Sequence, residues 1–257
     1  MDLLKWSVED MVATIKIANP PANAISTKVL QELSLVLDEV EYDQTVRVVV
    51  IHGEGRFFSA GADIKEFTAL STEEQFSSLG KNGQQIFERM ENFTKPIIAA
   101  IHGAALGGGL ELAMACHFRL VSQKAKLGLP ELQLGIIPGF AGTQRLPRYV
   151  GTARAAEMLL TSTPITGVEA VQAGLCNHAY ADEELLENAL KMANQIAKKS
   201  PVAVKSALQL LRFSKTKEFY AGVDREAELF GEAFLTEDGK EGIDAFINKR
   251  EPVFNGK

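Results

Sequence analysis

The 257-residue chain has few of the features that mark secreted, membrane-spanning or nucleic-acid-binding proteins. It contains two cysteines, Cys116 and Cys176, and no signal-peptide pattern at its N-terminus, so we expect buried thiols and no disulfide framework. No segment reaches the roughly 20 apolar residues that cross a bilayer. A net charge of −6 argues against binding nucleic acid through bulk positive charge. These absences favour a cytoplasmic protein with neither a nucleic-acid nor a membrane partner.

Several catalytic signatures are also missing. The chain has no Gly-x-Ser-x-Gly nucleophile elbow and no Gly-x-x-x-x-Gly-Lys phosphate loop. A run of three glycines, Gly107-Gly108-Gly109, lacks the spacing of a dinucleotide-binding fingerprint. The four histidines show no metal-ligand spacing with one another or with the cysteines, so we expect no metal site.

Ordinary composition and alternating patterns predict an α/β fold. Hydrophobic residues make up 46% and charged residues 23% of the chain, which is long enough for a large hydrophobic core. Short apolar strands such as residues 46–51 alternate with helical patterns such as residues 29–40 until about residue 180. Ser71 with Glu74 predicts a capped helix start. We therefore expect an α/β core over residues 1–195 and a helical region over residues 196–257, within a C-terminal series of predicted helices at residues 182–199, 201–213, 217–234 and 237–250.

The three glycines lie where a predicted strand gives way to a predicted helix. Backbone N–H groups in the first turn of a helix have no partner within the helix, and glycine permits a ligand to approach them closely. That arrangement suits a developing oxyanion, although a plain tight turn is the alternative interpretation. Glu111 follows within an otherwise apolar stretch, so its carboxylate is predicted to be buried. It would then be either functional or part of a buried ion pair.

Two further elements become informative only in combination with the first. Glu131 follows Gly128-Leu129-Pro130, and alone it would be a charge at a helix N-terminus. The segment Ser59-Ala60-Gly61-Ala62-Asp63 alone would be a turn. Together the three elements supply backbone N–H donors for a negative oxygen and two carboxylates that can move protons. This equipment suits chemistry next to a thioester carbonyl.

In order and spacing these elements resemble the crotonase (enoyl-CoA hydratase/isomerase) superfamily, and most of all its enoyl-CoA hydratases. The resemblance runs from about Ile15 to Phe254 and includes the ending Glu241-Gly242-Ile243-Asp244-Ala245-Phe246. It implies a spiral of repeated ββα units followed by C-terminal helices that mediate assembly into a homotrimer, and usually into a hexamer made of two trimers. It also implies that coenzyme A enters as part of the substrate, so that no separate cofactor is needed.

The resemblance assigns roles residue by residue. The N–H groups of Ala62 and Gly108 would form the oxyanion hole, while Glu111 would activate water and Glu131 would supply a proton to C2. Gly139 would help to hold the substrate water. Lys249 would reach the nucleotide bound to a neighbouring subunit. The positions that would bind coenzyme A, or lie near its adenine or the acyl group, are Asn23, Ala24, Ala60, Asp63, Ile64, Lys65, Phe230 and Lys249. For both lysines a solvated surface position is the alternative interpretation.

Two departures from the family pattern and two other functions stay open. His117 stands where the family usually has aspartate, and Phe140 is bulkier than the small residues common there, so it could shorten or reshape the acyl pocket. One alternative is another crotonase-fold enzyme, such as an enoyl-CoA isomerase, a decarboxylase or a thioester hydrolase. The other is a non-catalytic member that binds a CoA ester or RNA. The presence of both Glu111 and Glu131 favours the hydratase.

Overall fold

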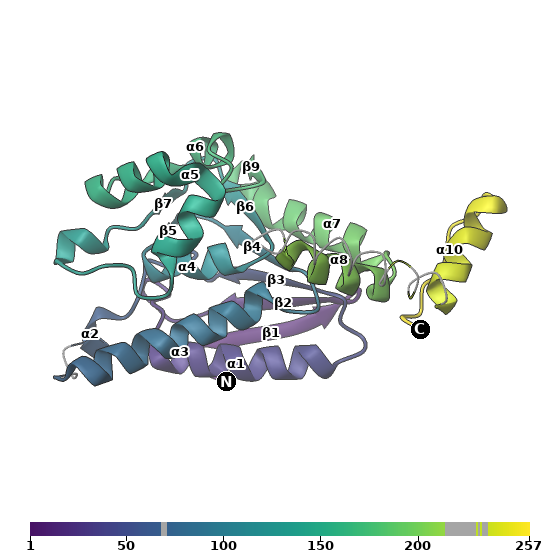
Figure 1. Cartoon of the computed structure of the whole chain (residues 1–257), viewed down its shortest axis with the longest axis horizontal. Coiled ribbons are helices and arrows are strands. Elements are labelled where there is room, and N and C mark those ends of the chain that lie inside the picture. Colours follow the sequence, from purple (N-terminus) through teal and green to yellow (C-terminus); the bar gives the residue numbers. More distant parts are fainter. Residues whose placement is uncertain (68–70, 214–229, 231, 233–235) are drawn as a thin grey trace.

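The computed structural model describes residues 1–67, 71–213, 230, 232 and 236–257, and its centre is a six-stranded sheet (Figure 1). The strand order is β1-β2-β3-β4-β6-β9, and every neighbouring pair is parallel except the antiparallel β1 and β2. Three short strands form a second sheet in the order β5-β7-β8. The strands are β1 (Leu4–Glu9), β2 (Val12–Ile17), β3 (Val48–Gly53), β4 (Ile97–Ile101), β5 (Ala104–Leu106), β6 (Phe118–Ser122), β7 (Lys126–Gly128), β8 (Ile165–Thr166) and β9 (His178–Tyr180).

Both faces of the large sheet are buried, which explains why its central strands are continuously apolar. Successive side chains of a strand point to opposite faces. In β3, Val49 and Ile51 pack with α1 (Thr27–Tyr42), α3 (Glu73–Glu91) and α4 (Gly108–Ala115), whereas Val48 and Val50 pack with α7 (Leu185–Ala197). The strand predicted at residues 46–51 and the helix predicted at residues 29–40 are thereby confirmed, each within two or three residues.

Helix α3 begins one residue later than the sequence pattern indicated. The capping box is formed by Thr72, whose hydroxyl accepts the Gln75 N–H at 3.3 Å while the Gln75 side chain accepts the Thr72 N–H at 3.2 Å. The predicted box of Ser71 with Glu74 is therefore wrong by one residue, because two overlapping pairs satisfy the same three-residue spacing. Farther along this helix, a Cβ at Gly83 would lie 2.4 Å from the ring of Phe140, so the glycine makes room for that ring.

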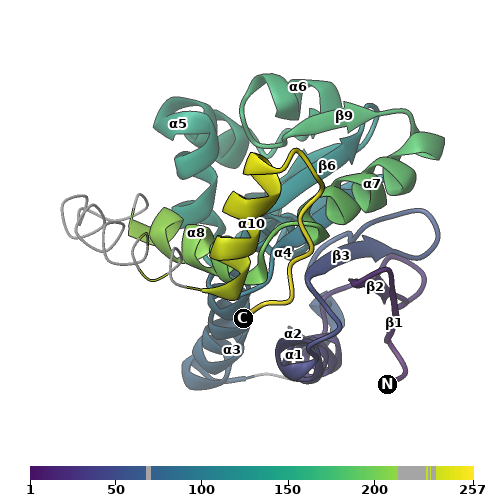
Figure 2. The same cartoon turned by 90° about the vertical axis from the view of Figure 1, so that its right-hand side faces the viewer.

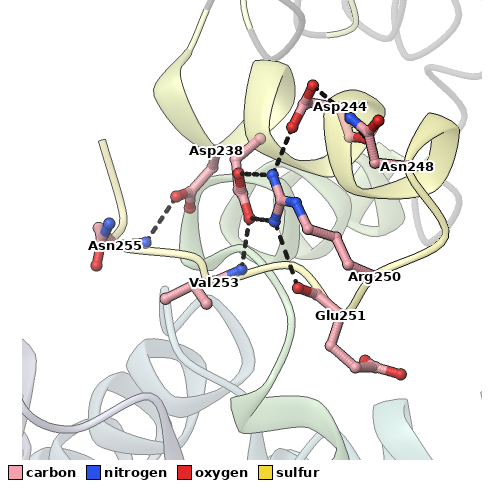
Figure 3. Close-up of polar contacts among 8 residues, drawn as sticks. Asp238, Asp244, Asn248, Arg250, Glu251, Val253 and Asn255 are labelled. Atoms are coloured by element: carbon pink, nitrogen blue, oxygen red, sulfur yellow. Dashed lines mark hydrogen bonds and ion pairs between the residues drawn. The ribbon is translucent and has the colours of Figure 1, made fainter.

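The C-terminal part lies at one end of the molecule (Figures 1 and 2). Helix α8 (Pro201–Phe213) buries none of its residues within the chain, and α10 (Glu237–Ile247) is fastened by the tail that follows it. Asp238 accepts the Asn255 N–H at 2.7 Å, and Arg250 contacts Asp244 at 2.5 Å (Figure 3). Both segments are helical as predicted, whereas the helix predicted at residues 217–234 lies almost wholly outside the described residues. The boundary at residue 195, which falls within α7, stays a prediction.

The remaining helical elements are α2 (Ile64–Phe67), the 3₁₀ turns η1 (Glu131–Leu134) and η2 (Asp182–Glu184), α5 (Gly142–Thr161) and α6 (Gly167–Gln172). In the described ranges, no helix combines the length and the apolar character that crossing a bilayer requires. The elements that matter for the site are β5, which leads into α4, and β7, which leads through η1 into α5.

Candidate active site

Glu111 lies in the first turn of α4, and the chain enters that helix through a conformation that favours glycine. Gly107 has φ 49° and ψ −127°, which a side chain would strain. Glu111 is 1% exposed, and its Oε1 accepts the N–H of Phe140 at 2.8 Å and that of Gly142 at 2.7 Å. The turn of residues 139–142 therefore fixes the direction of this carboxylate.

The surroundings of Glu111 bring the pKa of its carboxyl group close to neutral pH. Burial, together with the nearby Glu131 carboxylate, raises the pKa of Glu111 to about 7. The two N–H donors and the positive charge of Arg145 act in the opposite direction. A carboxyl group with a pKa near the working pH is well suited to act as a general base.

Glu131 opens η1 next to the start of α4. Its Oε2 is buried and has no hydrogen-bond partner among the described residues. Burial raises the pKa of this carboxyl group as well, which favours its protonated form. A Cβ at Gly107 would lie 2.8 Å from Glu131 Oε1, so the glycine leaves the space that the second carboxyl group occupies.

The backbone of Ala62 and that of Gly108 line the same cavity as these carboxyl groups. A Cβ built on Gly108 would lie 3.2 Å from the Ala62 nitrogen, so the two backbone segments run side by side. The Ala62 segment is fixed from both sides, because Gly61 C=O accepts from Ile25 at 2.8 Å and Ser59 C=O accepts from Leu106 at 3.1 Å. Within the described ranges, neither Ala62 N–H nor Gly108 N–H donates to a protein acceptor. Both donors can therefore bind an anionic oxygen, aided by the dipole of α4.

A cavity of about 190 Å³ joins the carboxyl groups and the two donors. Its remaining lining is mostly apolar, and the side chains of Ile64, Leu134 and Ile137 are exposed at the surface. Phe140 forms a buried part of the wall and packs edge-on against Phe87, with ring centroids 5.4 Å apart. An apolar cavity with a few convergent polar groups suits an acyl chain attached to a polarised carbonyl.

The structure brings together about half of the residues that the sequence pointed to. Those lining the cavity are Glu111, Glu131, Ala62, Gly108, Ala60, Ile64 and Gly139. Those not lining it are Asn23, Ala24, Asp63, Lys65, Phe230 and Lys249.

Asn23 and Asp63 have clear local roles beside the cavity. The buried Asn23 amide donates to the C=O groups of Glu54 and Phe57 at 2.8 and 2.7 Å, which holds the loop leading to Ala62. Asp63 Oδ1 accepts the Lys65 N–H at 3.0 Å at the start of α2. These two side chains shape the neighbouring backbone.

The C-terminal candidates lie elsewhere in this chain. Phe230 lines a separate cavity beside α8 and α10, and Lys249 is exposed just after α10. The departure at His117 is structural: its Nδ1 accepts the Ile97 N–H at 3.0 Å and so links the end of α4 to β4.

The sequence pattern did not point to one buried ion pair next to the cavity, Arg145 with Glu91. Arg145 is buried behind the turn of residues 139–142, where its Nε lies 2.9 Å from Glu91 Oε2 and its Nη1 donates to Phe140 C=O at 2.7 Å. Arg145 was visible in the segment Gly142-Thr143-Gln144-Arg145, but nothing local distinguishes Glu91 from other charges on an amphipathic helix. The part of the chain that the structure describes contains no group of three or more His, Cys, Asp or Glu residues that could hold a metal ion.

Comparisons with known proteins agree with this geometry. The model of the enoyl-CoA hydratase/isomerase family matches residues 7–257. A probable enoyl-CoA hydratase of Bacillus subtilis strain 168 is 57% identical over 258 residues, covering 100% of both chains. A short-chain-enoyl-CoA hydratase of Clostridium acetobutylicum is 42% identical, covering 95% of this chain and 94% of the relative. The crystal structure of an enoyl-CoA hydratase from Bacillus anthracis superposes with a TM-score of 0.95 at 36% identity, covering 100% of both chains.

Proposed function

The chain belongs to the enoyl-CoA hydratase/isomerase family and has its crotonase fold, and from that premise we propose that it adds water across the C2=C3 bond of 2-enoyl-CoA thioesters. The product would be a 3-hydroxyacyl-CoA. One observation carries the proposal: two carboxyl groups with raised pKa values share an apolar cavity with two unpaired backbone donors, among the described residues.

The two donors would act on the thioester oxygen. As water adds to C3, charge moves onto this oxygen, and the N–H groups of Ala62 and Gly108 stabilise the enolate-like transition state. Loss of one such donor typically costs about 2.7–4 kcal/mol. Because both groups belong to the backbone, they are already in place before the substrate enters.

The two glutamates would share the proton transfers. Ionised Glu111 accepts a proton from the attacking water, whose oxygen bonds to C3. Protonated Glu131 delivers a proton to C2, and the C2=C3 π electrons complete the new C–H bond by way of the enolate. The reaction therefore ends with Glu111 protonated and Glu131 ionised, and proton exchange restores the starting state. Since the groups interact, their two pKa values belong to the pair.

Coenzyme A would be the carrier portion of the substrate, and no other cofactor takes part in this proposal. Lys65 of this chain and Lys249 of a neighbouring copy are proposed to contact its phosphates. A trimer or hexamer would bring such a copy into reach. The absence of buried residues in α8, a helix with four leucine or valine side chains in its last ten residues, supports association.

Crotonyl-CoA in ¹⁸O-labelled water tests the reaction. We expect rapid loss of the enoyl-thioester absorbance and one labelled oxygen at C3 of the product. Release of free coenzyme A would indicate a hydrolase, and preferential conversion of a 3-enoyl-CoA would indicate an isomerase. If crotonyl-CoA binds but remains unchanged, the hydratase proposal is wrong for this substrate, and longer and branched enoyl chains become the next test.

A further inference from the structure

We propose that Arg145, paired with Glu91, is a positioning residue that holds the turn of residues 139–142 against Glu111 and so orients the base. The inference rests on the proposed function, because it takes Glu111 as the group that activates water. Arg145 does not line the cavity. Any effect on catalysis must therefore pass through the turn or through the electric field at Glu111.

The geometry forms a continuous chain from α3 to the carboxylate. Arg145 Nε lies 2.9 Å from Glu91 Oε2, and the two side chains are 5% and 12% exposed. Arg145 Nη1 donates to the C=O of Phe140 at 2.7 Å, and the N–H of Phe140 donates to Glu111 Oε1 at 2.8 Å. Phe140 is thus hydrogen-bonded through both its C=O and its N–H. A shift of the Arg145 guanidinium would therefore move the N–H that orients Glu111.

The turn needs such a support because its backbone is strained. Ala141 has φ 70°, a left-handed conformation that residues other than glycine seldom adopt. An arginine can grip two acceptors at once, because its planar guanidinium presents several donors in fixed directions. A lysine at position 145 would keep the charge but has a single ammonium group on a flexible stem.

The charges around Glu111 give the inference a direction that can be measured. Glu131 faces it from η1 and Arg145 from α5, with Glu91 of α3 behind the arginine, while Tyr149 of α5 bonds the other end of α4. The Arg145 charge lowers the pKa of Glu111, and Glu91 offsets part of that charge. Removal of the Arg145 charge should raise the pKa of Glu111, and removal of the Glu91 charge should lower it.

Four variants, each assayed with crotonyl-CoA across the pH range, test the proposal. Arg145→Met is expected to lower kcat by about 10²-fold with little change in KM, as misplacement of a catalytic group does. It should also move the acidic limb of kcat/KM to higher pH. Arg145→Lys should lose kcat but leave that limb in place, and Glu91→Gln should move the limb to lower pH. The matched control is Arg148→Met, because Arg148 reaches the same glutamate at 3.8 Å but is 49% exposed, and its kcat should change by less than about twofold.

The outcomes separate this inference from the proposed function. If the unmodified enzyme does not hydrate any 2-enoyl-CoA, the proposed function fails first. If it is active while the Arg145 variants behave like Arg148→Met, Arg145 does not position the base. Movement of the acidic limb in the same direction for Arg145→Met and Glu91→Gln would also overturn the inference. If Arg145→Met fails to fold, the other two variants still test the inference. The acidic limb of kcat/KM should stay in place for Arg145→Lys and move to lower pH for Glu91→Gln.

Discussion

The two glutamates of the cavity are the same residue type on very different supports. Glu111 lies on α4, whose eight residues are all buried, and two N–H groups hold one of its oxygens. Glu131 lies on η1, which buries none of its residues, and its Oε2 has no partner in the described structure. The base that we propose at Glu111 must aim one water at one carbon, so it benefits from rigid support. An acid that must follow C2 as the substrate settles can use a looser one, because segments with few buried contacts open at low cost.

The largest expected effect comes from replacing each carboxyl group separately by an amide. Both Glu111→Gln and Glu131→Gln should lower kcat with crotonyl-CoA within the range of about 10²–10⁴-fold that is typical of general acid–base catalysis. We expect Glu111→Gln near the upper end, because its fixed amide can still accept both N–H bonds but cannot take a proton. Glu131→Gln should lie near the lower end, since water can deliver a proton at a looser site. Equal losses of kcat in the two variants would contradict the idea that Glu111 is held more rigidly than Glu131.

A smaller loss of kcat is expected when a glycine next to each carboxyl group is replaced by alanine, whose methyl group would contact that carboxyl group. A Cβ at residue 142 would lie 2.8 Å from Glu111 Oε1, and one at residue 107 would lie 2.8 Å from Glu131 Oε1. Gly142→Ala should lower kcat by about 10²-fold because Glu111 has nowhere to move. Gly107→Ala should lower kcat less but lose more stability, since a backbone at φ 49° and ψ −127° is unfavourable for alanine by about 1–3 kcal/mol.

The control for this pair is Gly135→Ala. Gly135 also has a positive φ, 71°, but a Cβ there meets nothing within 4 Å. It should therefore show a loss of stability with little loss of kcat. Measurements of kcat and of the free energy of unfolding on all three variants separate the backbone strain from the steric pressure on each carboxyl group.

The rigid burial of Glu111 should also be visible in stability. Its folded-state pKa of about 7 lies above the ordinary value of 4.5, so protonation favours the folded state. This contribution is complete below about pH 4.5 and is lost as the pH rises through about 7. Glu111→Gln should therefore be more stable than the unmodified protein at about pH 8, by on the order of 3 kcal/mol, and the difference should disappear near pH 4. Urea unfolding of both proteins at the two pH values measures it, and a difference that does not depend on pH would contradict the burial argument.

The smallest expected effect comes from changing the side chain of Phe140, the residue whose backbone N–H donates to Glu111. Phe140→Leu keeps the N–H that Glu111 accepts but shortens the wall of the cavity. Activity on crotonyl-CoA should change only a few-fold, while kcat/KM for longer enoyl chains should rise by about tenfold relative to it. Phe87→Leu is the matched control, because Phe87 packs behind the ring without lining the cavity. A parallel loss on all chain lengths would mean that the ring supports the base instead of limiting the substrate.

The sequence predicted what depends on local pattern. Residues 46–51 and 29–40 were recognisable because periodicity and burial agree within a few residues. The burial of Glu111 followed from its apolar neighbours. The capping box at Thr72 was misplaced by one residue because two pairs compete in the same window.

What the sequence could not provide are contacts between distant segments. The donors to Glu111 lie 29 and 31 residues away from it, and Arg145 meets Glu91 across 54 residues. Asn23 likewise acts on a loop more than 30 residues ahead of it. No local pattern encodes such pairs, because they arise only when β4, β5 and β7 bring their ends together.

Phe140 has a further consequence for how enzymes built on this fold can diversify. Its peptide N–H donates to Glu111, and its ring lines the cavity. A mutation at this codon exchanges the ring and leaves the peptide group unchanged. A single substitution here is therefore expected to change the range of acyl chains that fit while the hydrogen bond to Glu111 remains, provided that the new side chain still packs over Gly83.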